Sequence, residues 1–162
     1  VAGGCTSDSP EGASTTTTSI VAGGRSAIDG LVGLCQTALE SEPPDIAKLA
    51  IDPSMTGQLL SIPDDLVDDA SQEFFDCLGA EQAAVYLATD FIVTGVVLPA
   101  DTATCLIPAM ETDGPAILEV SIRRARLETA PDDAIDTFTD AFLTCVPRPS
   151  RAAGLRAGNP LG

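Results

Sequence analysis

Five cysteines carry the most specific chemistry in this chain, which contains no histidine. Without histidine, neither a Ser-His-Asp nor a Cys-His catalytic arrangement can form, and no histidine can ligate a metal or a haem. A cysteine-only zinc site is disfavoured because no two cysteines have Cys-x-x-Cys spacing. Four cysteines are therefore predicted to form two disulfides, and we expect no metal and no cofactor. These four are Cys35, Cys77, Cys105 and Cys145.

An internal repeat selects one of the three possible pairings of these cysteines. Residues 61–77 align without a gap onto residues 129–145, and both segments carry Pro-Asp-Asp and then Phe three residues before Cys. Weaker matches upstream extend the two units to about 26–78 and 99–146. If each unit is self-sufficient, the disulfides are Cys35–Cys77 and Cys105–Cys145. Each would close a loop of about 40 residues and stabilise the fold by about 4 kcal/mol.

Carboxylates are the other abundant reactive groups, but their pattern does not indicate catalysis. A glycosidase-type hydrolase needs two carboxyl groups that face each other across a cleft. Here the aspartates crowd the starts of two predicted helices, where the helix dipole and solubility explain them. Their spacing also lacks the Asp-x-Asp-x-Asp-Gly pattern of a calcium loop. We therefore predict no catalytic residue. The two clusters are Asp64, Asp65, Asp68 and Asp69, and Asp132, Asp133, Asp136 and Asp140.

Arg123, Arg124 and Arg126 form the only compact basic group inside the predicted fold. Such a group can bind an anion or an acidic partner. It can also pair with neighbouring carboxylates such as Glu119 and Glu128, which is the interpretation that we favour.

The elements that must position these residues are predicted to be helices, so the fold class is all-α: a bundle of two tandem units, each closed by one disulfide. Ser61 and Thr129 are expected to cap the repeated helix of each unit. Only residues 91–98 have any strand character, and they alternate poorly. Buried faces are expected at Val67, Ala70, Phe74 and Cys77, and at Ile135, Phe138, Phe142 and Cys145. Further helices are expected at 25–40, 44–51, 54–60, 80–93, 100–112 and 114–128.

The two ends of the chain have compositions that cannot form a core. Residues 1–24 are rich in Ser, Thr and Gly, and residues 147–162 in Pro, Gly and Arg, so we expect a disordered tether and a disordered tail around a helical domain at 25–146. The first five residues, Val-Ala-Gly-Gly-Cys, resemble the lipobox of bacterial lipoproteins. That resemblance implies lipidation of Cys5 and a signal segment upstream.

The composition also limits the partners. A formal net charge of −16 makes nucleic acid an unfavourable partner and an anionic lipid surface unfavourable for the body of the protein.

Disulfides indicate an extracytoplasmic compartment. The whole layout, repeated Cys-containing helical units behind a lipobox and a Ser/Thr tether, resembles uncharacterised exported lipoproteins of actinobacteria.

These patterns lead to a functional hypothesis that involves no catalysis. We expect a lipoprotein of the bacterial cell envelope that binds or scaffolds another protein, held to the outer face of the membrane only through its lipid anchor. One alternative is a carrier of a lipid or small apolar ligand, formed by amphipathic helices around an aliphatic interior. The second alternative is a carboxylate-dependent hydrolase.

Overall fold

A computed structural model describes residues 15–146 of the chain, with side chains described from Gly23 onward. Within this range the chain forms helices and no strand, which confirms the predicted all-α class. The elements are α1 (Thr15–Leu39), α2 (Ile46–Ile51), α3 (Pro53–Ser61), the 3-10 helix η1 (Asp64–Leu66), α4 (Val67–Val93), α5 (Thr102–Ala125) and α6 (Asp132–Cys145).

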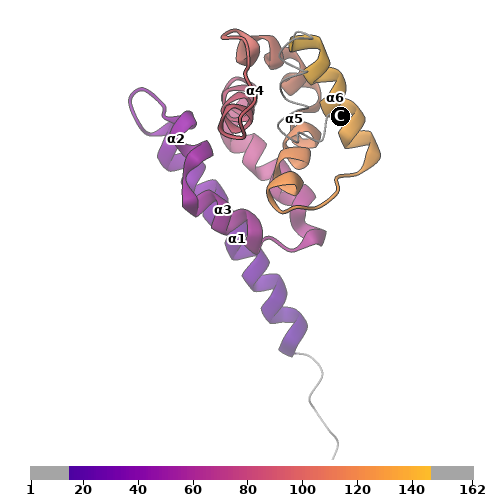
Figure 1. Ribbon diagram of the computed structural model, residues 1–162. Coiled ribbons are helices and arrows are strands. Elements are labelled where there is room, and N and C mark those ends of the chain that lie inside the picture. The colour runs from indigo at the N-terminus through magenta and orange to yellow at the C-terminus, as the bar shows by residue number, and fades with distance from the viewer. Residues whose placement is uncertain (1–14, 147–162) are drawn as a thin grey trace, which may run out of the picture.

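The helices share one hydrophobic core. The short helices α2 and α3 pack along α1, and α5 lies between α4 and α6 (Figure 1). The packing of α4 against α5 joins the first half of the chain to the second. A single buried cluster therefore includes residues from every α-helix, among them Ile28, Ile46, Met55, Phe74, Met110 and Phe138. The tandem duplication itself remains a prediction.

Two long helices are each bent at a residue that leaves the helical conformation. In α4 the bend is at Gly79, which has φ 68° and ψ 168°. In α5 it is at Asp113, two residues before Pro115. Proline has no N–H to donate and its ring clashes with the preceding turn, so a bend at this point is expected. The bend at Gly79 separates the repeated helix from the helix predicted at 80–93, and the bend at Asp113 separates the helices predicted at 100–112 and 114–128.

The first helix begins earlier than predicted. Helix α1 starts at Thr15, so residues 15–24, which we expected in the tether, belong to a helix. Their Ser, Thr and Gly content is unfavourable for an isolated helix, but α1 is continuous with a strongly buried segment. Its side chains Ile28, Leu31 and Cys35 are fully buried. Residues 1–14 and 147–162, including the predicted lipidation site Cys5, lie outside the described range.

The predicted helix caps are wrong. The Ser61 hydroxyl donates to the Gly57 carbonyl oxygen at 2.8 Å instead of capping the next helix. Helix α6 begins at Asp132, with Pro131 at the N-cap position and no side-chain cap, so Thr129 lies outside it. Proline favours the extended conformation of the residue before it, which moves each helix start beyond the hydroxyl residue.

The predicted buried faces are confirmed for the most part. Val67, Ala70 and Phe74 are buried in α4, as are Phe138 and Phe142 in α6. The remaining three residues, Cys77, Ile135 and Cys145, are only half-buried because each lines a groove at the surface.

Residues 91–98 form no strand. Helix α4 continues to Val93, and the chain then turns at Gly95, which has φ 89°. Phe91 and Val96 are buried in the core, whereas Val97 is exposed. Within residues 15–146, no helix combines the length and the apolar character needed to span a membrane.

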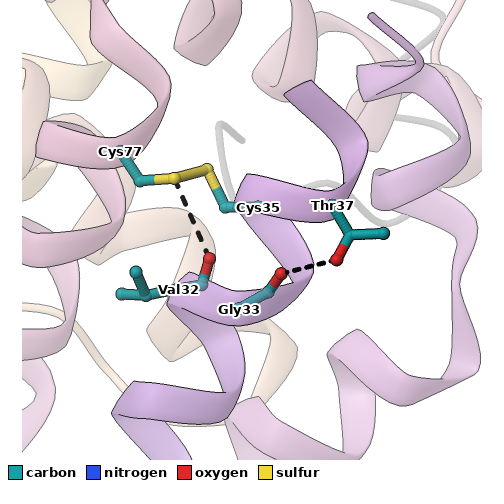
Figure 2. The surroundings of a disulfide bond; sticks show 5 residues. All are labelled: Val32, Gly33, Cys35, Thr37 and Cys77. Carbon is teal, nitrogen blue, oxygen red and sulfur yellow. Dashed lines mark hydrogen bonds between the residues drawn. A yellow bond between two sulfur atoms is a disulfide. The ribbon is translucent and has the colours of Figure 1, made fainter. Parts of the chain in front are cut away.

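Both predicted disulfides are present. Cys35 of α1 is bonded to Cys77 of α4, and Cys105 of α5 is bonded to Cys145 of α6. Figure 2 shows the first bond beside the Val32 carbonyl oxygen, which lies 3.9 Å from the Cys77 sulfur. This is a packing contact, because a disulfide sulfur carries no proton to donate. The two disulfides indicate an oxidising, extracytoplasmic environment.

Candidate functional site

The last turn of α5 and its C-cap carry the three arginines that the sequence singled out, and each contacts carboxylates of this chain. Arg123 donates from Nε to Glu119 Oε1 at 2.6 Å. Its other nitrogens lie 3.6 Å from Asp68 Oδ1 and 3.7 Å from Glu128 Oε2. Positive charge at a helix C-terminus also interacts favourably with the helix dipole. The favoured pairing of this group with Glu119 and Glu128 is confirmed.

Arg124 connects α5 to the end of α4. Its guanidinium group pairs with Asp90, which also accepts a 2.9 Å hydrogen bond from the Ser121 hydroxyl. The same guanidinium lies 4.7 Å from the centre of the Phe91 ring, a distance at which a cation is attracted to an aromatic face. Phe91 in turn stacks on Phe138 of α6, with the ring centres 5.6 Å apart. Arg124 therefore helps to fix the aromatic contact between α4 and α6.

Arg126 reaches back to the first half of the chain. Its Nη2 atom lies 2.6 Å from Glu128 Oε1 and 2.5 Å from Asp64 Oδ1, and its Nη1 atom donates to backbone carbonyls at the end of α3. The hydrogen bond to Glu128, followed by the negative charge of its neighbours, raises the pKa of Arg126 despite its burial. The same hydrogen bond lowers the pKa of Glu128 below its ordinary value of 4.5. All three guanidinium groups are thus held by internal contacts.

The turn after α5 places Leu127 in an unusual conformation. The Glu128 N–H donates to the Arg123 carbonyl at 2.9 Å, and the Leu127 N–H donates to the Arg124 carbonyl at 3.0 Å. This pair of bonds is the Schellman motif that ends many helices, in which glycine usually occupies the left-handed position. Here Leu127 occupies it, with φ 59° and 95% of its surface exposed.

A groove of about 400 Å³ lies beside this turn, between the end of α5 and the start of α6. Its volume is within the usual range for ligand sites. Most of the lining side chains are apolar, and Phe138, supported by Phe91, forms part of the lining. The full set is Val120, Arg124, Leu127, Glu128, Thr129, Ala130, Ile135 and Phe138.

Exposed carboxylates occur at the start of α6, the helix that lines one side of the groove with Ile135 and Phe138. Asp132, Asp133 and Asp136 are exposed at the start of α6, and none of them pairs with a cation of the described residues. The arginine closest to the groove, Arg124, is already paired with Asp90. Asp132 lies one helical turn before Ile135, so the border of the groove on the α6 side carries unpaired negative charge.

A second groove, of about 430 Å³, lies at the other end of the α5–α6 pair. The disulfide between Cys105 and Cys145 lines it, together with the carboxylates Asp113 and Asp140. Both carboxylates are exposed to water. Within residues 15–146, no group of three or more Cys, Asp or Glu side chains is arranged to hold a metal ion.

Sequence reasoning did not find the apolar groove. It identified Ile135 and Phe138 only as part of a buried helix face and did not single out Leu127. No glycine or asparagine follows α5, so the sequence has no sign of a left-handed turn there. The arginines, in contrast, were recognisable as a group.

Comparisons with known proteins supply no relative for this chain. No protein-family model matches it, and no curated protein or solved structure shows significant similarity to it.

Proposed function

We propose that this chain is an exported lipoprotein, anchored to the outer face of a bacterial membrane through Cys5, whose helical body binds another protein of the cell envelope without catalysis. The two disulfides support export, because such bonds persist in oxidising compartments. The lipobox-like residues before the tether support the anchor.

Leu127 is the observation that carries the binding role. An aliphatic side chain exposed to 95% beside an apolar groove costs solvation free energy and gains nothing within the chain. The left-handed backbone adds conformational strain of roughly 1 kcal/mol, which persists only where the surroundings impose it. The hydrogen bonds and ion pairs of the α5 turn impose it here. A partner that covers Leu127 together with the apolar groove would remove the solvation cost.

A carrier of a small apolar ligand is the second candidate, because the groove has a suitable volume. The interior between α4 and α6 favours the protein-binding role. Phe91 and Phe142 lie 4.8 Å apart, and Phe138 and Phe142 lie 6.1 Å apart, so aromatic side chains occupy this part of the core. Native mass spectrometry of the purified protein distinguishes the two, because a carrier would retain a bound apolar molecule. A carboxylate-dependent hydrolase would need two facing carboxylates, and Asp113 and Asp140 are one pair that lines the same groove.

The anchor is tested by the intact mass of full-length protein purified from membranes. We expect a diacylglyceryl modification that is lost in Cys5→Ser, and we expect Cys5→Ser to move from the membrane fraction to the soluble fraction. An unmodified mass and an unchanged distribution would contradict the anchor.

The binding role is tested by photo-crosslinking in intact cells. A photoreactive residue at position 127 is expected to give one discrete adduct, and Ile135→Asp on the same chain is expected to abolish it. The control carries the same photoreactive residue at position 60, because Leu60 is also exposed, at 59%, but lies on α3 and does not line the groove. Equal adducts from both positions, or none, would contradict a binding groove at α5–α6.

A further inference from the structure

We propose that the groove between α5 and α6 binds a positively charged segment of the partner protein, which inserts one bulky apolar side chain against Leu127, Ile135 and Phe138. This inference rests on the proposed protein-binding function and adds the chemistry of the partner. Both proposals use Leu127 and the groove, and the charge of the surface enters only here.

The lining of the groove favours an apolar side chain. Phe138 is buried and stacked on Phe91, and Arg124 lies over the Phe91 ring. The floor of the groove is therefore held in place before any partner arrives. A preformed apolar surface loses little conformational entropy on binding, so one inserted side chain can supply much of the affinity. Leu127 and Ile135 provide the two walls.

The negative charge of the surface favours a basic segment around that side chain. All but two of the 24 acidic residues lie in the described part of the chain, whereas three of the eight cations lie beyond it. Four of the described cations, Arg25, Arg123, Arg124 and Arg126, are paired with carboxylates of the chain. The exposed aspartates at the start of α6 are unpaired, and Asp132 is one turn from Ile135 of the lining, so they add net negative charge near the groove. A basic segment is attracted to such a surface and an acidic one is repelled.

The same charges argue against a lipid occupant. An anionic lipid headgroup would be repelled by the aspartates of α6, and a neutral apolar molecule would gain nothing from them. A peptide segment with basic residues on either side of an apolar one can contact the apolar lining and the aspartates at the same time. The lining and its border therefore favour a basic peptide over a small apolar ligand.

The test measures the binding of two labelled peptides to the full-length protein by fluorescence anisotropy. The first peptide has a central leucine between alternating arginines and alanines, and the second has serine in place of that leucine. We expect the leucine peptide to bind about tenfold more tightly, since burying one leucine is worth roughly that factor. Binding is expected to weaken as salt concentration rises.

Leu127→Gly separates binding from folding. Glycine adopts the left-handed conformation without strain, so this variant is expected to be at least as stable as the parent chain. We expect it to bind the leucine peptide about tenfold more weakly and the serine peptide no differently. The control is Leu60→Ser, which removes an exposed leucine from α3 and is expected to leave binding unchanged.

A matched pair of charge variants tests the border of the groove. Asp132→Asn with Asp136→Asn removes two exposed carboxylates one turn apart at the start of α6. Asp65→Asn with Asp69→Asn removes two with the same spacing near the start of α4. We expect severalfold weaker binding of both peptides only for the α6 pair.

Three results would overturn the inference. The leucine and serine peptides could bind equally, Leu127→Gly could have no effect, or both charge pairs could weaken binding alike. A fourth result would also overturn it. If the full chain with Arg148→Gln, Arg151→Gln and Arg156→Gln binds the peptides more strongly, the groove is occupied by the chain's own basic residues. If the crosslink from position 127 forms while both peptides fail, the binding function stands and only the basic chemistry of the partner is wrong.

Discussion

The guanidinium group of Arg126 donates a 2.9 Å hydrogen bond to the carbonyl oxygen of Leu59 in the last turn of α3. It also donates to the Ile62 carbonyl just beyond that helix. The last carbonyl groups of a helix lack donors within the helix. The side chain of Arg126, the C-cap residue of α5, supplies donors to the carbonyl groups at the end of α3. This contact spans 67 residues of sequence and connects the two halves of the fold.

Replacing Arg126 is expected to destabilise the protein more than replacing a fully exposed arginine would. Arg126→Ala removes donors from the end of α3, Asp64 and Glu128 together, and we expect a loss of about 2–3 kcal/mol in the free energy of unfolding. Arg126→Lys should recover only part of it, because lysine lacks the planar fork of donors. Chemical denaturation measures both. The control, Arg25→Ala, removes an exposed ion pair with Glu73 and is expected to cost much less, because water screens exposed pairs. Equal losses at the two sites would contradict the role of Arg126.

Gly114 marks the closest approach of α5 to α4. A Cβ atom placed there would lie 2.1 Å from the Phe75 ring, so alanine cannot be accommodated without moving that side chain. We expect Gly114→Ala to cost about 1–3 kcal/mol. Gly33→Ala is the control, since nothing lies within 4 Å of its Cβ position in α1, and alanine should there stabilise the helix by up to about 1 kcal/mol. Thermal unfolding distinguishes the opposite signs, and stabilisation by both substitutions would exclude the close approach.

Tyr86 should remain protonated in the folded protein well into the alkaline range. Burial, reinforced by the negative charge of Asp90, raises its pKa above the ordinary value of 10. The folded state therefore holds the phenolic proton more tightly than the unfolded state. The contribution of Tyr86 to stability is complete below pH 10 and decreases as the pH rises from there through the raised folded value.

The chain contains one tyrosine and no tryptophan, so the absorbance band of tyrosinate reports this group alone. We expect tyrosinate to appear together with unfolding rather than before it. Tyr86→Phe should lessen the loss of stability above pH 10 while keeping the ring contact with Phe74, whose centre lies 5.1 Å away. Free titration near pH 10 in the folded state would show that the phenol is not buried.

The two disulfides should differ in their rates of reduction. Cys105 is exposed and Cys145 is half-buried, and both line a groove. Cys35 is 0% exposed, so attack on the accessible sulfur of Cys77 would have to release a thiolate into the apolar core. Exchange needs access to one sulfur and a stable leaving thiolate at the other.

Limited reduction followed by alkylation and peptide mapping measures this order. We expect Cys105 and Cys145 to be alkylated about tenfold faster than Cys35 and Cys77. A chain with Cys105→Ser and Cys145→Ser isolates the slower bond and should reduce at that slow rate. Equal rates in the parent chain would mean that both bonds open only on global unfolding.

Much of the fold could be predicted because its evidence is local or repeated. Prolines and a glycine mark the ends and bends of helices, and apolar spacing marks the buried faces that contain Phe74 and Phe138. The internal match of 61–77 with 129–145 selected the correct disulfides from three possibilities. The hydroxyl caps failed because the prolines at 63 and 131 move the helix starts, a conflict between two local rules.

The amino-acid sequence by itself determined the helical class, the disulfide pairing and the excess of negative charge, because composition and short-range spacing decide these properties. Only the tertiary structure decided that the two halves share one core and that Arg126 connects them. It also decided that Leu127 takes a left-handed conformation beside an apolar groove. These features depend on contacts between residues that are far apart in the chain, and local sequence patterns do not specify such contacts.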